Sequence, residues 1–243
     1  MQLDFIGYTG KTGSIIYNNL KDKYDFKNLV NSKNYKEYII NVDNNTTVID
    51  FSSKGFIFDF LEKNKDRKFK DFFYITGVTG FSREEFDKID EHFRNINIVG
   101  LHFPNFSLGI NLMNDFVKKI GLYFSNAEII EMHHQTKKDK PSGTSLMTSK
   151  IICNTWRSNN INNEVAIHSV RLPSLVAHQT VIFSNEYGEV LEITHHSLNR
   201  LCFSFGVQKV LDKILYEFKN GNYELNFKCG LQFNINLLDF LEK

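Results

Sequence analysis

The feature that most constrains this fold is an alternation of short apolar runs with amphipathic stretches over about the first hundred residues. Apolar runs typical of strands cover 3–6, 26–30, 46–51, 72–76 and 96–100. Helical spacing of apolar residues lies between them, around 15–20, 56–61 and 82–89. The residues from Ser82 to Glu85 resemble a capping box at the start of the last of these helices. Strands that alternate with helices in this way predict the α/β class, with a doubly wound parallel sheet.

After Pro104 the pattern changes to that of a mixed α+β domain. Helical spacing covers 108–120, 141–156 and 203–218, and 127–133 is apolar enough for a strand. Apolar and polar residues alternate over 165–172, 177–185 and 190–196. That alternation is typical of antiparallel strands with one solvated face.

Composition excludes several classes of protein. Lys and Arg number 29 against 28 Asp and Glu, so no strong field attracts the chain to nucleic acid or to an anionic membrane. No apolar run approaches the roughly 20 residues that span a bilayer, and the first residues do not read as a signal peptide. Cys153, Cys202 and Cys229 are far apart in sequence and odd in number, so we expect neither a disulfide framework nor a CxxC metal site. We therefore expect a soluble, cytoplasmic protein without nucleic-acid or membrane partners.

A glycine-rich turn stands between the first predicted strand and the first predicted helix. Its residues are Gly7, Tyr8, Thr9, Gly10, Lys11, Thr12 and Gly13. Glycine lets the backbone bend tightly and lets a pyrophosphate approach main-chain N–H groups, and the helix N-terminus adds oriented donors. The turn therefore predicts dinucleotide binding, and a tight structural turn is the alternative.

The residues after the second predicted strand bear on the choice of coenzyme. The acidic residue that usually bonds the ribose 2′-hydroxyl is missing, and Asn31, Ser32 and Lys33 follow Val30 instead. Asn31 can still bond a ribose hydroxyl, and Lys33 with Lys11 can meet a 2′-phosphate, unless Lys33 is simply solvated. We expect either NADPH or NADH, with weak discrimination between them.

The most informative stretch runs from Glu131 to Thr144. His133 and His134 end a predicted strand and point in opposite directions. Ser142 is a candidate helix N-cap, after which Gly143, Thr144 and Ser145 present N–H groups. With Lys137, these groups form a site for a carboxylate or phosphate, beside a histidine that can act as an acid near neutral pH.

Two further histidine interpretations follow from spacing. The His133–His134 pair has no third ligand at a suitable distance along the chain, so we expect no metal. The second pair, His195–His196, lies on a predicted strand and is interpreted as structural.

The same stretch resembles the signature of the 4-hydroxy-tetrahydrodipicolinate reductase family, also called dihydrodipicolinate reductases, of bacterial lysine and diaminopimelate synthesis. The matching residues are Glu131-x-His133-His134-x-x-Lys137-x-Asp139-x-Pro141-Ser142-Gly143-Thr144. Other stretches agree in order, namely 7–13, 49–52, 76–81, 105–111 and 191–195 with Arg200. The resemblance therefore covers nearly the whole chain.

The resemblance implies a domain organisation and an assembly. A Rossmann-type dinucleotide-binding domain would cover 1–106 and be completed by 203–243. An inserted α+β substrate-binding and oligomerisation domain with a mixed sheet would cover 107–202. The family forms homotetramers through the sheets of this inserted domain. Its reaction is hydride transfer from NADPH or NADH to a cyclic dicarboxylate, which yields tetrahydrodipicolinate.

The resemblance also implies roles for individual residues. His133 would be the acid/base group and Lys137 the second catalytic residue. The substrate-binding residues would be His134, Ser142, Gly143 and Thr144. The nicotinamide side would be lined by Gly77, Val78, Thr79, Phe103, Pro104, Asn105 and Phe106.

The sequence departs from the family at several places, including the end of the glycine turn at Thr12 and the short region before Thr46, and it leaves two other functions open. Val78 replaces a threonine of the family's Gly-Thr-Thr-Gly, and Leu172-Pro173-Ser174 follows Arg171 where small residues and Asp are usual. The alternatives are another NAD(P)-dependent amino- or hydroxy-acid dehydrogenase and a catalytically silent dinucleotide-binding sensor. Retention of His133 and Lys137 argues against the silent sensor.

Overall fold

Over residues 1–222 and 227–242, which the computed structural model describes, the chain folds into two units. Unit 1 comprises Met1–Phe106 and Phe203–Lys243, and unit 2 comprises Ser107–Cys202. No helix among the described residues is both long and apolar enough to span a bilayer. The assignment of coenzyme to unit 1 and of substrate to unit 2 stays a prediction.

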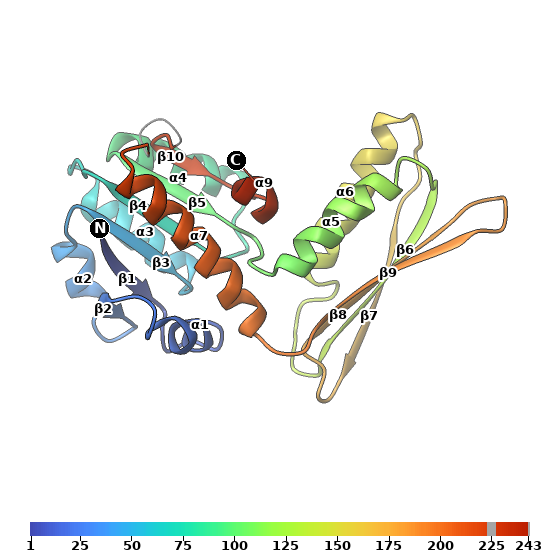
Figure 1. The fold of residues 1–243 in the computed structure, drawn as a ribbon, viewed down its shortest axis with the longest axis horizontal. Coiled ribbons are helices and arrows are strands. Elements are labelled where there is room, and N and C mark those ends of the chain that lie inside the picture. The colour runs from blue at the N-terminus through green and yellow to red at the C-terminus, as the bar shows by residue number, and fades with distance from the viewer. Residues whose placement is uncertain (223–226, 243) are drawn as a thin grey trace. The chain divides into compact units, whose positions relative to one another are not determined.

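Unit 1 is built on a parallel sheet with the strand order β2-β1-β3-β4-β5-β10 among the described residues (Figure 1). The strands are β1 (Gln2–Ile6), β2 (Phe26–Val30), β3 (Thr46–Asp50), β4 (Phe72–Thr76), β5 (Ile98–His102) and β10 (Gly230–Gln232). The chain winds outward from β1 in both directions, because β2 and β3 flank it on opposite sides. This order confirms the predicted doubly wound sheet, whose switch point lies between β1 and β3.

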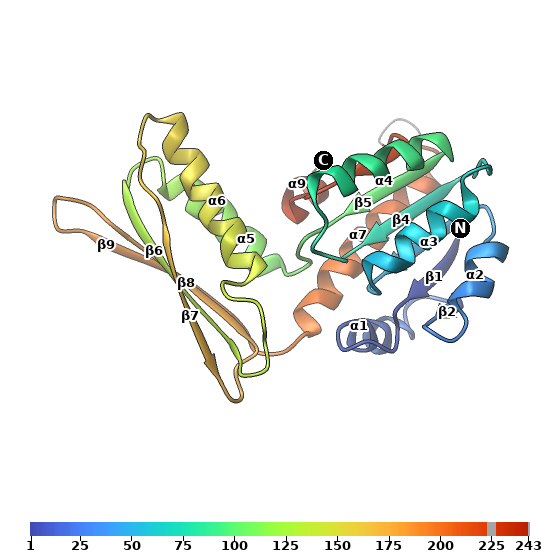
Figure 2. The same ribbon diagram turned by 180° about the vertical axis from the view of Figure 1, so that it is seen from behind.

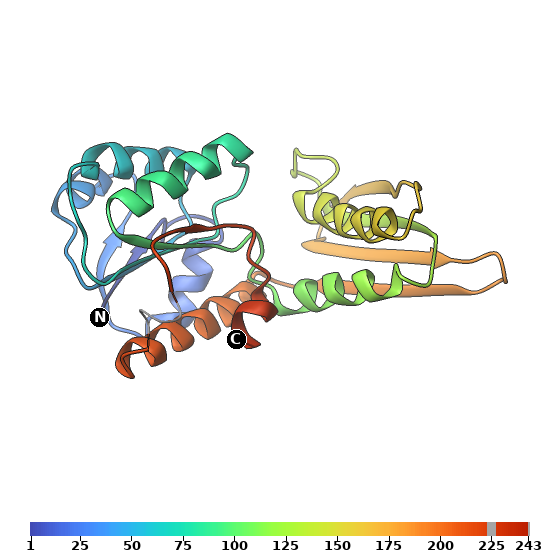
Figure 3. The same cartoon turned by 90° about the horizontal axis from the view of Figure 1, so that it is seen from above.

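Helices cover both faces of this sheet, as Figure 3 shows edge-on. One face carries α1 (Gly13–Leu20), α7 (Leu201–Lys219) and α9 (Leu237–Glu242). The other carries α2 (Tyr35–Asn41), α3 (Lys54–Asn64) and α4 (Arg83–Asn95) (Figure 2). Side chains alternate across β4, so that Phe72 and Tyr74 enter one core while Phe73 and Ile75 enter the other. Burial on both faces explains why these strands are nearly continuous apolar runs.

Unit 2 is a mixed sheet with the order β7-β6-β8-β9. Its strands are β6 (Asn126–His134), β7 (Ala166–Leu172), β8 (Ala177–Ser184) and β9 (Val190–Ser197). Helices α5 (Leu108–Ile120) and α6 (Gly143–Ser158) pack on one face, around Val117, Ile129 and Trp156. The indole N–H of Trp156 donates to the carbonyl of Phe124 at 2.7 Å, which satisfies a polar group in this core.

Two strand predictions need correction. The antiparallel pairing expected for 165–172 is wrong, because β7 pairs in parallel with β6. The reason is that α6 follows β6 and precedes β7 along the chain. A helical crossover of this kind lets the next strand run in the same direction as the first. The strand expected at 96–100 is Ile98–His102, since α4 extends to Asn95 and Asn97 adopts a left-handed turn with φ of 60°. The capping box at Ser82 and Glu85, by contrast, is confirmed.

A buried histidine joins the end of unit 1's sheet to its C-terminal segment. The Nδ1 atom of His102 accepts the N–H of Asn234 at 3.1 Å, and its Nε2 atom lies 3.0 Å from the carbonyl of Val78. Since an amide N–H can only donate, Nδ1 is unprotonated and Nε2 donates to Val78. Burial lowers the pKa of His102 to about 4, against the opposing effect of the Val78 carbonyl. The ring is therefore neutral at pH 7.

We predict that His102 makes unit 1 sensitive to acid. Its pKa in the folded protein lies below the ordinary 6.5, so its contribution to stability is present above pH 6.5 and is lost as the pH falls toward 4. The loss reaches about 3 kcal/mol by pH 4. Urea unfolding of wild type and His102→Gln between pH 7 and pH 4 measures it. The stability gap between the two proteins should shrink as the pH falls, and parallel curves would contradict the prediction.

Candidate active site

Three predicted coenzyme segments assemble at the carboxyl edge of unit 1's sheet. The backbone ladder continues past the strand ends: the N–H of Phe51 donates to Ile6, that of Gly77 to Asp50 and that of Phe103 to Thr76, each at 3.0 Å. The glycine turn, the loop after β4 and the segment after β5 therefore lie along one edge of the sheet, with the segment after β3 between the first two. In open α/β sheets, ligands bind at this edge beside the switch point.

Two glycines of the turn are required by the backbone itself. Gly7 has φ of 80°, and a Cβ there would lie 2.7 Å from the backbone of Phe51. A Cβ on Gly13 would lie 2.2 Å from the carbonyl oxygen of Gly7. Gly10 is different, because its nearest neighbour would be that same oxygen at 3.2 Å and the residue is exposed. Gly7 and Gly13 are thus required by the fold, whereas the backbone around Gly10 does not require a glycine as strictly.

The start of α1 has the character of an anion site. Thr12, at the N-cap, makes no side-chain capping hydrogen bond, and the first turn contains no acidic residue. Lys11 and Lys33 are both exposed. The side chain of Asn31 donates to the hydroxyl of Tyr8 at 3.2 Å and accepts the N–H of Lys33 at 2.8 Å, so it is already engaged within the protein.

The predicted nicotinamide residues differ in what they can offer. The side chains of Val78, Phe103 and Phe106 are buried, so contact with a coenzyme would have to come from their backbones. A Cβ on Gly77 would lie 2.6 Å from the ring of Phe51, which explains the glycine at this position by aromatic packing. Thr79, Pro104 and Asn105 are the more exposed members of these two segments.

In unit 2 the strand β6 delivers its two terminal histidines to different surroundings. His133 turns to the same side as Glu131, two residues earlier, and bonds to it through Nδ1. His134 bonds instead to the hydroxyl of Thr136 at 2.9 Å. The ammonium of Lys137 lies 2.8 Å from a carboxylate oxygen of Asp139, and both groups follow the strand in one loop.

The carboxylate of Glu131 is the centre of this arrangement. Its side chain is 0% exposed, and its second oxygen accepts from Arg171 of β7 at 2.8 Å. Burial raises the pKa of Glu131, but hydrogen bonds from Arg171, Ser169 and His133 outweigh that effect and leave the pKa below its ordinary value. Burial also lowers the pKa of His133, and the neighbouring Lys137 and Arg171 lower it further, against the raising effect of Glu131.

Glu131 belongs to the sequence motif but has no predicted role there, and its partner Arg171 lies outside the motif. Alternation along a strand places Glu131 beside His133, so that contact was readable from spacing. The contact with Arg171 was not, because it depends on β7 lying next to β6, 40 residues away in sequence.

The cap of α6 is confirmed, with one correction. Ser142 accepts the N–H of Ser145 at 3.2 Å, and its hydroxyl also lies 2.9 Å from that of Ser145. The expectation that the Ser145 N–H is available to a ligand is therefore wrong. Ser142 is only 2% exposed, so its hydroxyl serves the cap. Gly143 and Thr144 remain the members of this helix start that reach the surface.

The second histidine pair lies in two different settings. His195 packs against the start of α5, where its Nε2 lies 3.5 Å from the hydroxyl of Ser107. His196 meets His178 across the β8–β9 pair. Among the described residues, no group of three or more His, Cys, Asp or Glu side chains is placed to hold a metal ion.

We predict that alanine substitutions at two glycines of the turn lower the stability of the protein by different amounts. Gly13→Ala places a methyl group against a backbone carbonyl that cannot move freely, so it should lower the free energy of unfolding by about 2 kcal/mol or more. Gly10→Ala meets only a 3.2 Å contact and should cost less than about 1 kcal/mol. Urea unfolding of both variants measures the difference. Equal stabilities would contradict this account of the turn.

A family model and curated relatives both match this chain, and both are named for the same reductase. Residues 109–227 match the family model described as dihydrodipicolinate reductase, C-terminus. A 4-hydroxy-tetrahydrodipicolinate reductase from Streptococcus pneumoniae (strain P1031) is 39% identical over 159 residues, which cover 58% of this chain and 61% of the relative. The chain thus matches about three fifths of the length of these curated relatives. These matches confirm the predicted resemblance.

Solved structures agree on the fold. A dihydrodipicolinate reductase from Paenisporosarcina sp. TG-14, with dipicolinate bound, has a TM-score of 0.71 at 22% identity and covers 97% of this chain and 98% of its own. A mutant meso-dapdh from Clostridium tetani E88, solved with DAP, has a TM-score of 0.53 at 13% identity and covers 99% of this chain and 95% of its own. At such identities the likeness shows the fold alone, and it confirms the predicted fold class.

Proposed function

We propose that this chain is a 4-hydroxy-tetrahydrodipicolinate reductase that works in the cytoplasm, because residues 109–227 match the family model described as dihydrodipicolinate reductase, C-terminus. It would use NADPH or NADH to reduce a cyclic dicarboxylate to tetrahydrodipicolinate, with loss of water from the 4-hydroxy substrate. The observation that carries this proposal is the segment from Glu131 to Thr144. It joins an imidazole, an ammonium group and a helix start in one loop at the end of β6.

The glycine turn fits a dinucleotide. The exposed backbone at Gly10 leaves room for a pyrophosphate, and the uncapped start of α1 offers it oriented N–H groups. The turn Gly7–Gly13 would hold this part of the coenzyme, and the loops 77–79 and 103–106 would flank the nicotinamide. When bound, the coenzyme supplies a hydride. No acidic side chain stands among Asn31, Ser32 and Lys33 to repel a 2′-phosphate, which supports use of both coenzymes.

The loop after β6 fits a dicarboxylate. Lys137 can exchange its present partner, Asp139, for a substrate carboxylate at little cost, because Asp139 is well exposed. The second carboxylate would be bound by His134 and by the start of α6, at Gly143 and Thr144. His133 is neutral at pH 7 while no ligand is near, since its pKa lies below the ordinary value. A dianionic substrate would raise that pKa and so load His133 with the proton that it delivers to the electron-rich centre left by hydride addition.

Steady-state kinetics with 4-hydroxy-tetrahydrodipicolinate and each coenzyme tests this function. We expect turnover with both, and a preference below about a hundredfold, or 2.7 kcal/mol. His133→Gln should lower kcat by about a hundredfold or more with little change in KM, because it removes a proton donor. Lys137→Ala should damage both parameters, and Thr144→Ala should raise mainly KM.

Two results would count against this proposal. Turnover of aspartate or homoserine in place of the cyclic substrate would indicate a different amino-acid dehydrogenase. Coenzyme binding without oxidation on any of these substrates would indicate a silent sensor.

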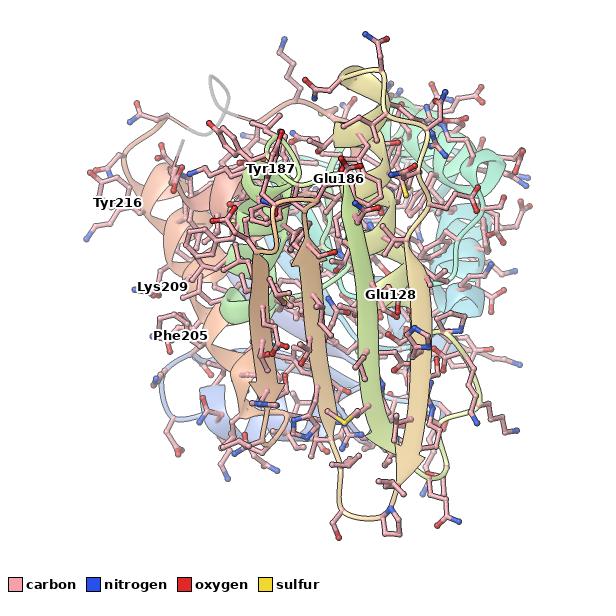
Figure 4. The ribbon with its side chains drawn as sticks, turned by 90° about the vertical axis from the view of Figure 1, so that its right-hand side faces the viewer. Glu128, Glu186, Tyr187, Phe205, Lys209 and Tyr216 are labelled. Carbon is pink, nitrogen blue, oxygen red and sulfur yellow. The ribbon has the colours of Figure 1, made fainter. Side chains whose placement is uncertain are left out.

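We further propose that the protein is a homotetramer. In Figure 4 the strands of unit 2 face the viewer, with α5 and α6 behind them. The side chains of this outer face include Ile130, Met132, Val170 and Ile182, which alternate with residues of the core. A sheet face with an apolar centre is a natural contact surface for a second copy. Light scattering at micromolar concentration should give four times the chain mass of 28.4 kDa, and a monomer would contradict the proposal.

A further inference from the structure

The carboxylate of Glu131 bonds to His133 although a second partner, Arg171, already offsets its charge. Each oxygen of this fully buried carboxylate has a separate partner: one accepts from Arg171, and the other meets Nδ1 of His133. A buried carboxylate needs a cation to offset its desolvation, and Arg171 meets that need by itself. The bond to the imidazole is therefore an additional constraint on His133.

Arg171 holds the carboxylate in a fixed position. Its side chain is 5% exposed, and its terminal nitrogens donate to three acceptors, the carboxylate of Glu131 and the carbonyls of Asp139 and Val170. The bond to Asp139, at 2.6 Å, also ties the loop that carries Lys137 to the sheet. One guanidinium thus orders both the carboxylate behind His133 and the loop beside it.

The charge of Glu131 decides which nitrogen of His133 carries a proton. An ionised carboxylate only accepts hydrogen bonds, so Nδ1 of His133 must donate and must hold its proton even when the ring is neutral. Nε2 is then the nitrogen that gains and loses a proton. The other charged groups around the ring are Lys137, with its partner Asp139, and Arg171 of β7, while β8 contributes the uncharged Ala177 opposite His133.

We infer that Glu131, held by Arg171, is the positioning residue that fixes the tautomer and orientation of His133 so that Nε2 is its working nitrogen. The inference rests on the proposed function for its catalytic consequence. The tautomer itself is a property of the resting protein. Carboxylate partners that orient a catalytic or ligating imidazole act in the same way in unrelated sites.

The decisive variant is Glu131→Gln. The amide oxygen stays with Arg171, which can only donate, so the amide NH2 group turns to His133 and can only donate as well. Nδ1 must then accept, the proton moves to Nε2, and the working nitrogen of the neutral ring is reversed. The loss of the negative charge also lowers the pKa of His133, because Glu131 is the group that raises it.

The chain offers a matched control on the same strand. Glu128 also pairs with a histidine, His168, at 2.8 Å, but both side chains are exposed. Figure 4 shows Glu128 on the outer face of the sheet. Glu128→Gln makes the same chemical change to a carboxylate–histidine pair that lies away from His133.

The experiment combines 15N NMR of the histidine rings with kinetics. Wild-type His133 should be protonated at Nδ1 when neutral, and Glu131→Gln should shift it to Nε2 while Glu128→Gln does not. Glu131→Gln should lower kcat at least about tenfold and move the kcat–pH profile to lower pH, with KM for the coenzyme unchanged. Because Glu128 lies on the outer face that we propose as the contact between copies, Glu128→Gln serves as the control for the tautomer measurement alone.

Each outcome decides between the alternatives. A wild-type His133 protonated at Nε2 overturns the inference, and this measurement does not depend on the folding of any variant. An unchanged pH profile in folded Glu131→Gln also overturns it, because a merely structural pair would cost stability only. If His133 shows the expected tautomer while the wild type fails to reduce the cyclic substrate, the proposed function fails and the positioning of His133 stands.

Discussion

The arrangement of the candidate catalytic groups in unit 2 depends on one buried carboxylate, that of Glu131. Glu131 is fully enclosed, and leaving such a charge without a cation would cost about 3–5 kcal/mol. The required cation comes from Arg171, which can reach it only because β7 lies parallel to β6 and places Arg171 beside His133. From this single pair follow the orientation of the imidazole and the attachment of the loop at Asp139. The pair that solves a burial problem therefore also organises the groups that we assign to catalysis.

Unit 1 meets a different constraint, the close approach of backbones at the carboxyl edge of its sheet. Gly7 and Gly13 exist because neighbouring carbonyls leave no room for a side chain. Close approach also places aromatic rings against the loops, as at Gly77, where the ring of Phe51 fills the space that a side chain would need. At the same edge, Nε2 of His102 donates a hydrogen bond to the carbonyl of Val78. A closely packed edge of this kind is suited to binding a ligand through main-chain groups.

Local signals predicted well wherever the deciding interaction is local. The Ser82 capping box and the Ser142 cap both involve residues three apart, so sequence spacing was sufficient. The same locality explains the error at Ser145, because the serine that caps the helix also satisfies the N–H group that was expected to be open. The pairing of β7 failed for the opposite reason. Alternating polarity reports which face of a strand is buried, and carries no information on the direction of its neighbour.

The sequence by itself determined the period of each element, the glycine turn after the first strand and the motif from Glu131 to Thr144, because these depend on the order of nearby residues. It also placed Glu131 and His133 on one face, through the two-residue repeat of a strand. Only the tertiary structure decided that Arg171 completes this group and that His102 braces the loop at Val78. Both contacts join residues far apart in the chain, and strand order in a sheet, which brings them together, is a property of the whole fold.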